Sequence, residues 1–368
     1  INYCLAPDIN FNSKKEKKIQ EKISEKSKNL SANDKKRIIE LAKNLKARQE
    51  KSDNPEILPK VTKEDIPKSR EYAKSQSFED DNKNFYYKVG TNGITYHSII
   101  LPCDPLTQDE FKIASLFTNT LTDVGIGDKS YEDVQKIQSA VTGGISASFT
   151  LIPNENQSAH SLGLKITSKS LEENENKMQD LMIDTAKNSN FSDKNRIKDM
   201  LNFISSDNEK SLIQNGHVLS MSNAAAQINN ISSTNDFASG LNFITNTNSL
   251  SKNIEKDSNL DQYIEILNSI KNKICPIPSY SFTASSLNLD QSQINFSFDN
   301  QDNAFNVQNY FDIQQESIGW ITGAQVTYCA EAFPTVDFFH DDAPVLSVLG
   351  AVLRNGYLHS AIREKGGA

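Results

Sequence analysis

One order of sequence patterns occurs twice in the chain, and it constrains the possible folds more than any other feature. A strand-like segment, an acidic turn, a long apolar helix, a short helix and a glycine pair run from Ile94 to Gly144. The same order returns roughly two hundred residues later, from Ala324 to Gly367. The spacing predicts two related α+β domains, the second present only in part. Chance similarity between two α+β segments is the alternative.

The first copy is predicted to open with a β-hairpin. Phe85–Val89 and Ile94–Leu101 alternate apolar and polar residues on either side of a turn at Gly90–Gly93. A helix should start at Asp109, because its apolar residues recur on one face until Gly125.

Further elements follow the first helix in an α+β layout rather than a strict β-α-β alternation. Tyr131–Ala140 predicts a short helix, and the glycine pair at 143–144 predicts a tight turn into a strand. Leu162–Thr167 predicts another strand, and Asn288–Asn309 predicts a last strand and a connection. Three more helices are predicted, at Leu171–Ala186, Lys194–Ser206 and Glu209–Gln227.

The N-terminal part of the chain predicts a charged helical hairpin. Ser13–Lys51 carries apolar residues only at helical spacings, and Ser31 with Asp34 has the form of a capping box. The apolar thread is too short for a sustained heptad seam, which favours a solvated hairpin over a partner-binding coiled coil. Asn54–Asp81 contains three prolines and predicts an extended linker.

These patterns divide the chain into three parts. Residues 1–81 form the predicted hairpin and linker, residues 82–305 a complete α+β domain, and residues 306–368 the start of a related one. Because the chain begins on Ile1 and stops directly after a helix-like stretch, we expect both ends to lie inside a longer protein.

Composition narrows the possible partners. The net charge is −8, from 39 Lys plus Arg and 47 Asp plus Glu, which argues against binding to nucleic acid or an anionic membrane. The four cysteines are far apart and form no CxxC pair, so a reducing compartment is expected. No apolar run is long enough to span a bilayer.

The residues that could carry chemistry are few. None of the five histidines belongs to an HxxEH or HExxH pair, so no zinc site can be identified in this chain. The glycine pair at 143–144 lacks the Lys-Ser or Lys-Thr of a phosphate-binding loop. The segment GYLHSAIREKGGA places Arg363 at a helix end, where a cation is favourable and a guanidinium could bind a carbonyl oxygen.

Four segments carry a resemblance to a known family. They are IREKGGA at the C-terminus, TNGITYHSIILP, GDKSYEDVQKIQSAVTGG and NGHVLSMSNAAAQ. Together they resemble pitrilysin-type zinc metallopeptidases (the pitrilysin/insulinase superfamily) of the presequence-protease, falcilysin-like branch. The charged hairpin resembles the peptidase-associated region that joins the two halves of these enzymes.

The resemblance implies a clamshell of two halves, each built from two α/β-roll domains, that encloses a chamber and degrades unfolded peptides. It implies a Zn²⁺ ion held by an HxxEH motif and a later Glu, all N-terminal to Ile1, so that the N-terminal half of the same protein is a partner. Arg363 matches a substrate-binding Arg, whose partner Tyr would fall at position 369. A bacterial cytoplasm or an organellar matrix would suit such an enzyme, and this chain alone is expected to be inactive.

Two other functions stay open at this point. A non-catalytic scaffold or substrate-guiding subunit would keep the fold and lose the metal motif. A free-standing interaction module would use the hairpin of Ser13–Lys51 to self-associate. The incomplete second domain should also expose an apolar face at Val345–Leu353 and aggregate or lose local order.

Overall fold

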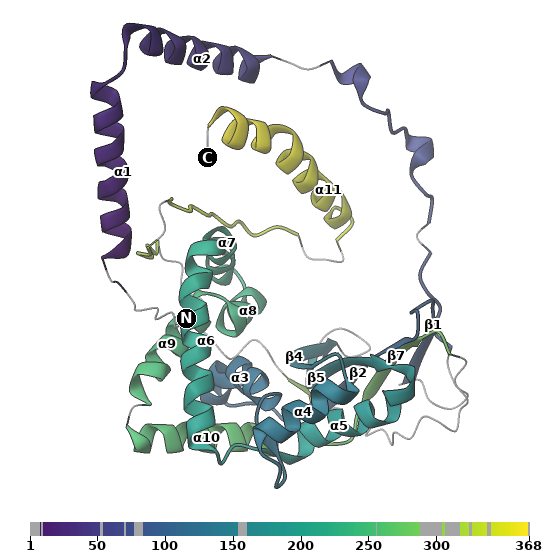
Figure 1. The fold of residues 1–368 in the computed structure, drawn as a ribbon. Coiled ribbons are helices and arrows are strands. Elements are labelled where there is room, and N and C mark those ends of the chain that lie inside the picture. The colour runs from purple at the N-terminus through teal and green to yellow at the C-terminus, as the bar shows by residue number, and fades with distance from the viewer. Residues whose placement is uncertain are drawn as a thin grey trace. The chain divides into compact units, whose positions relative to one another are not determined.

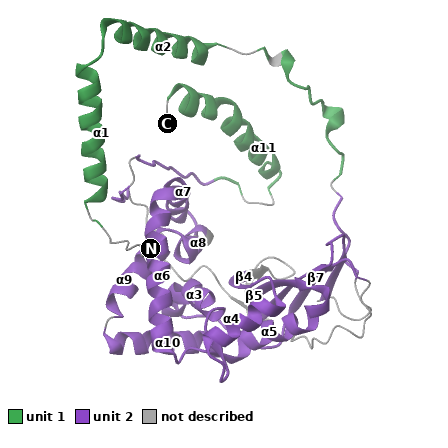
Figure 2. Cartoon of the chain, in the orientation of Figure 1, with its two compact units in different colours: residues 1–70, 335–368 green, residues 71–334 purple. Residues whose placement is uncertain are grey.

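The chain divides into two compact units in the computed structural model (Figure 2). One unit is Glu71–Pro334, and the other combines Ile1–Arg70 with Thr335–Ala368. The structure describes residues 8, 10–51, 54–69, 71–76, 84–153, 160–254, 256–287, 304–305, 317–323, 326–336 and 340–366.

A six-stranded mixed sheet forms the centre of the larger unit, and its α+β character agrees with the sequence prediction. The strand order is β1-β7-β2-β5-β4, with β8 pairing to one end of β5. The strands are β1 (Asn84–Lys88), β2 (Ile94–Cys103), β4 (Ile145–Pro153), β5 (His160–Leu171), β7 (Tyr280–Ser285) and β8 (Ala304–Phe305).

The predicted hairpin of β1 and β2 is wrong, because β7 lies between these two strands. Phe282 of β7 pairs with Phe85 of β1 in parallel and with Ser98 of β2 in antiparallel register. The connection from β1 to β2 therefore crosses two strand spacings, about 10 Å. It turns at Asn92 and Gly93, which both have positive φ angles of 56° and 80°.

Eight helices and a two-stranded sheet complete the described part of this unit (Figure 1). The small sheet pairs β3 (Gly125–Ile126) with β6 (Ser189–Asn190). The helices are α3 (Gln108–Leu121), α4 (Tyr131–Val141), α5 (Glu175–Asn188), α6 (Lys194–Gln214), α7 (Gly216–Ala226), α8 (Asn230–Ser239), α9 (Leu241–Asn253) and α10 (Asp257–Asn272).

The predicted helices are present, but the break between the last two falls elsewhere. The sequence placed it before Glu209, whereas α6 continues to Gln214 and α7 begins at Gly216. Glycine is a weaker helix former than the Ser and Asp residues where the break was expected. Of the segment Asn288–Asn309, only residues 304–305 are described, and the remainder of that prediction lies outside the described residues.

The hydrophobic core lies where α3 and α5 pack on one face of the sheet. Alternate residues of β2 and β5, such as Ile99 and Ile166, point into it and are fully buried. Phe117 of α3 is central, since its ring lies 6.1 Å from that of Phe149 and 5.8 Å from that of Phe191. Cys103, at the end of β2, is buried, and burial raises the pKa of its thiol to about 12.

A fully buried carboxylate organises the start of α9. Asp236 accepts hydrogen bonds from the backbone N–H of Leu241 at 3.0 Å and from the side-chain amide of Asn242 at 2.7 Å. Gly240 lies against this carboxylate, and a Cβ at that position would overlap Asp236. The negative charge satisfies donors at the helix N-terminus, and the glycine lets the two segments approach closely.

Glu110 joins the start of α3 to the end of α10. Its carboxylate accepts hydrogen bonds from Lys273 Nζ at 2.7 Å, from Ser269 Oγ at 2.6 Å and from the backbone N–H of Thr107 at 2.6 Å. Burial opposes ionisation of Glu110, but these hydrogen bonds outweigh it and lower the pKa to about 2. The carboxylate therefore stays charged inside the protein and holds two distant segments together.

Replacing Lys273 with Met should lower the free energy of unfolding by about 2 kcal/mol, because Glu110 loses a charged partner while it stays buried. Chemical denaturation followed by circular dichroism measures the change. Lys112→Met is the matched control. Lys112 pairs with Asp109 on the exposed side of α3, the helix that carries Glu110, and such an ion pair contributes at most about 1 kcal/mol. Equal effects of the two substitutions would contradict the assigned role of Glu110.

His97 is a buried imidazole in the centre of the sheet. Its Nδ1 lies 2.8 Å from the hydroxyl of Thr283 on β7. Burial lowers the pKa of His97 to about 4, below the ordinary value of 6.5, because the charged form would lose its hydration. His97 is therefore neutral in the folded protein at pH 7.

Between pH 6.5 and pH 4 the unfolded chain should bind a proton at His97 that the folded chain does not. The stability is complete above pH 6.5 and should fall by about 3 kcal/mol as the pH drops to 4. Chemical denaturation at several pH values in this range should show that the free energy of unfolding of His97→Gln changes less with pH than that of the wild type. His217→Gln, at an exposed position, should keep the wild-type slope. A wild-type slope in His97→Gln would assign the pH dependence to other groups.

The smaller unit contains α1 (Phe11–Lys28), α2 (Ala32–Glu50) and α11 (Ala343–Leu353). The predicted capping box is confirmed, since the backbone N–H of Asp34 donates to Ser31 Oγ at 3.1 Å. No residue of α1 or α2 is buried, and their pairing as a hairpin stays a prediction. The apolar face of Val345–Leu353 is exposed as expected, with Val348 64% exposed.

The strand predicted at Ala324–Phe333 is wrong for the part that the structure describes. Residues 326–336 form no strand and pair with none of the described strands. A strand depends on a neighbouring strand for its hydrogen bonds, and an alternating pattern alone does not supply one. The acidic turn before the last helix is confirmed, since Asp342 occupies the position before α11.

Candidate functional site

Arg363 lies on a short π-helical segment, Ser360–Lys365, that follows α11 through a second such segment, Arg354–Leu358. Its side chain is exposed, and none of the described acidic residues forms a salt bridge with it. The neighbouring Glu364 accepts a hydrogen bond from Ser360 at 2.9 Å. The guanidinium is thus available for an external contact.

The histidines of the described part do not gather. His97 is buried in β2, and the exposed ring of His217 at the start of α7 lies 6.1 Å from that of Tyr328. His340 accepts a hydrogen bond from the backbone N–H of Asp342 at 3.1 Å. Within the ranges described above, no three His, Cys, Asp or Glu side chains are placed to hold a metal ion. The described residues therefore do not fit a zinc site.

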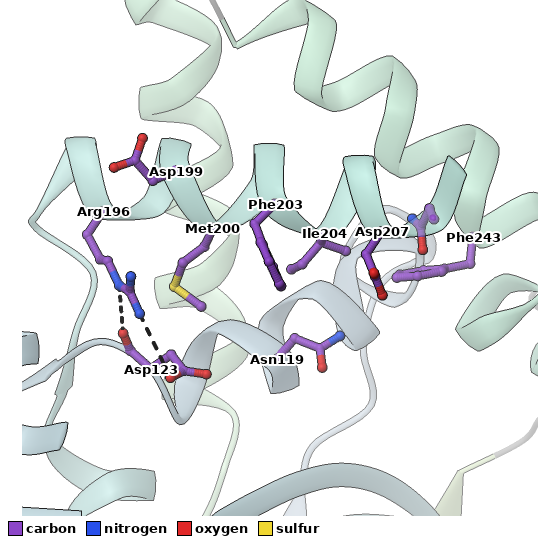
Figure 3. Close-up of a pocket in the computed structure, with 10 residues that line it drawn as sticks. Asn119, Asp123, Arg196, Asp199, Met200, Phe203, Ile204, Asp207 and Phe243 are labelled. Atoms are coloured by element: carbon purple, nitrogen blue, oxygen red, sulfur yellow. Dashed lines mark hydrogen bonds and ion pairs between the residues drawn. The ribbon is translucent and has the colours of Figure 1, made fainter. Parts of the chain in front are cut away.

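A groove of about 660 Å³ opens along α6, between that helix and residues of α3 and α9 (Figure 3). Figure 3 shows Met200, Phe203 and Asp207 of α6 directed toward the helix that carries Asn119, whereas Asp199 points away from it. Phe243 of α9 lies at one end. The lining residues are Asn119, Asp123, Arg196, Asp199, Met200, Phe203, Ile204, Asp207, Asn208 and Phe243.

The α6 residues of the groove form a single helical stripe. They recur at steps of three and four positions from Arg196 to Asn208, the spacing of neighbours on one helix face. The centre of the stripe is apolar: Met200 is buried beneath it, while Phe203 is 71% exposed. Aspartates flank this centre at positions 199 and 207.

Among the described residues that line the groove, Arg196 is the single cation, and it is already paired. Arg196 donates from Nε to the backbone carbonyl of Asp123 at 3.0 Å and lies 3.8 Å from the Asp123 carboxylate. Its guanidinium also stacks over the ring of Tyr131 at 4.2 Å. Asp207 lies 3.7 Å from Lys210, a solvent-exposed pair that contributes little. Two of the three lining aspartates, Asp123 and Asp207, thus already have a cation beside them.

Sequence analysis did not identify this groove, although part of its signal was present. The sequence predicted a helix at Lys194–Ser206, and Met200, Phe203 and Ile204 recur in it at helical spacing. Only the positions of α3 and α9 leave Phe203 exposed above a partly filled space. None of the described helices is long and apolar enough to cross a membrane.

The geometry defines a mixed α+β protein whose sheet is covered by helices and joined to a charged helical segment. This chain belongs to the family described as Peptidase M-16C associated, whose model matches residues 5–250. The match covers the charged helices and most of the larger unit, so the family predicted from the sequence is confirmed.

Full-length relatives support the same family. The chain is 25% identical to the mitochondrial presequence protease of Yarrowia lipolytica, over all of this chain and 38% of that protein. It is 26% identical to the mitochondrial presequence protease of Drosophila melanogaster, over 36% of its length. It is also 23% identical to Protein HypA of Clostridium perfringens, over 38% of that protein. The chain thus spans less than two fifths of these relatives.

Proposed function

We propose that this chain is the C-terminal-half portion of a metalloendopeptidase that degrades unfolded peptides, including cleaved targeting peptides, inside a closed chamber. The observation that carries the proposal is the match of the whole chain to part of proteins named presequence protease. In this proposal the chain supplies one wall of the chamber and a substrate-binding arginine. The rest of the enzyme is its partner, and mitochondrial relatives make an organellar matrix a suitable location.

The proposed Zn²⁺ ion would be held by residues outside this chain. No described group of side chains here is suited to that role. When bound, zinc would supply an activated water and polarise the scissile carbonyl. The part assigned to this chain is to bind and orient the peptide, and it does not depend on a local metal.

Arg363 is the residue of this chain that we assign to direct contact with substrate. Its guanidinium has a rigid fork of N–H donors that can hold a peptide carbonyl and the oxyanion that develops from it. The exposed position on the segment after α11 leaves these donors unshielded. Lys in its place would keep the charge but lose the fork.

In the protein extended to its natural ends, Arg363→Ala should lower kcat/KM for an unstructured peptide by about 100-fold, because a donor to the transition state is lost. Arg363→Lys should give a kcat/KM between that of the wild type and that of Arg363→Ala. Arg354→Ala is the matched control, since Arg354 is an exposed arginine at the start of the preceding helical segment, Arg354–Leu358. Initial rates with and without a metal chelator measure the effect.

Equal activity of the Arg363 and Arg354 variants would refute the role of Arg363 and leave the peptidase proposal standing. Absence of chelator-sensitive cleavage in the folded, metal-loaded wild type would instead favour the second candidate function. That candidate is a non-catalytic scaffold or substrate-guiding subunit of the same fold, and the groove along α6, with Phe203 exposed in it, favours it as a binding surface.

A further inference from the structure

We propose that oxygen atoms at one end of the six-stranded sheet bind a Ca²⁺ ion. The ligands would come from Thr95, Ser170, Ser285 and Glu175, with the carboxylate of Glu172 beside them. They lie on three neighbouring strands, β2, β5 and β7, and at the start of α5. The inference goes beyond the proposed function, because it concerns neither the peptide nor the zinc. All five residues belong to the larger unit.

The hydroxyl of Thr95 is the centre of the group. It lies 3.2 Å from the hydroxyl of Ser285 on β7 and 3.5 Å from Oε2 of Glu175 on α5. Thr95 and Ser285 are fully buried. Both separations are longer than the spacing of about 2.7 Å in an ordinary O–H···O hydrogen bond. The three oxygens therefore lie close together without tight hydrogen bonds between them.

The spacing of these oxygens suits Ca²⁺ better than Mg²⁺. With Ca–O distances of about 2.4 Å, adjacent oxygens of an octahedral shell are about 3.4 Å apart. With Mg–O distances of about 2.1 Å, they are about 3.0 Å apart. The observed separations of 3.2 and 3.5 Å are nearer to the first value. Ca²⁺ also accepts irregular shells, in which water completes the set of protein oxygens.

Ser170 supplies a buried hydroxyl without a partner. It is the cross-strand neighbour of Thr95, so the two side chains lie on the same face of the sheet. Ser170 is 4% exposed, and its Oγ makes no hydrogen bond within the described part of the chain. A buried hydroxyl in this state costs about 1–3 kcal/mol. That cost is offset when the oxygen is a ligand of a bound cation.

Two carboxylates lie beside these hydroxyls. Glu172 accepts a hydrogen bond from Ser286 Oγ, and Glu175 accepts one from the side-chain amide of Gln179 at 3.3 Å. Neither glutamate forms a salt bridge with the lysines, arginines and histidines that the structure describes. Burial raises the pKa of Glu175, and the like charge of Glu172 adds to the rise. A cation at this place would stabilise both charged carboxylates.

The same two carboxylates act on a third acidic group, the phenol of Tyr86 on β1. Its hydroxyl donates a hydrogen bond to the backbone carbonyl of Leu287 at 2.5 Å. Burial raises the pKa of Tyr86, and the charges of Glu172 and Glu175 add to the rise. Negative potential is thus concentrated at this end of the sheet. The groups around it present oxygen atoms only, the ligands that Ca²⁺ takes, whereas zinc sites use nitrogen and sulfur as well.

Ca²⁺ binding can be measured on this 368-residue chain by isothermal titration calorimetry and thermal unfolding. Ca²⁺ at about a hundredfold above its Kd should raise the Tm of the wild type by at least about 5 °C, because it binds only the folded state. Glu175→Gln should weaken Ca²⁺ binding at least about tenfold, since a charged ligand is lost. Mg²⁺ should bind the wild type at least about tenfold more weakly than Ca²⁺.

The matched control is Glu173→Gln, which removes the same charge from an exposed position in the same turn. Its Ca²⁺ affinity should stay within about twofold of that of the wild type. Equal weakening by Glu173→Gln and Glu175→Gln would overturn the proposal, because binding would then reflect net charge alone. A wild type whose Tm rises no more with Ca²⁺ than with NaCl of equal ionic strength would overturn it too.

Ser170→Ala separates a ligand oxygen from a hydroxyl that merely lacks a partner. Without Ca²⁺ the variant should be at least as stable as the wild type, because the unsatisfied hydroxyl is gone. With Ca²⁺ its affinity should fall by at least about threefold, since one ligand is missing. Wild-type Ca²⁺ affinity in Ser170→Ala would remove Ser170 from the site and, with it, the buried hydroxyl on which the proposal depends.

Discussion

The position of β7 between β1 and β2 is the constraint on which the larger unit depends. Tyr280–Ser285 comes almost two hundred residues after the strands that it joins, yet it pairs with both of them. The chain between β2 and β7 must fold back to this point before the strands of the sheet can pair. The buried contact of Glu110 with Lys273 fixes that return, because it ties the end of α10, just before β7, to the start of α3. A charged hydrogen bond in a buried setting holds this geometry more firmly than a surface ion pair would.

The groove along α6 is a consequence of the same closure. Helix α3 packs on β4 of the sheet and α10 packs on α3, while α6 is tied to the end of α3 by the contact of Arg196 with Asp123. Side-chain hydrogen bonds such as Ser205 to Asn248, at 2.7 Å, fasten α9 beside it. The space between these helices is therefore bounded by fixed elements. A site built on rigid helices keeps its shape when the ligand arrives, which lowers the entropic cost of binding.

Two exposed features of the chain, Arg363 and the groove along α6, differ in their chemistry. Arg363 offers a forked donor on a helical end, suited to a carbonyl oxygen or an oxyanion. The groove along α6 offers an exposed aromatic ring, Phe203, above the buried side chain of Met200.

The sequence by itself determined the family, the α+β class and most of the helices. It did so because caps such as Ser31 with Asp34, and apolar residues at helical spacing, act within a few turns of chain. Tertiary structure alone decided which strands pair, since β7 can separate β1 from β2 only when distant segments meet. It also decided that Phe203 faces a groove while Met200, on the same helix face, is buried. The physical reason is that strand partners and exposure depend on what lies across the fold, which local periodicity does not encode.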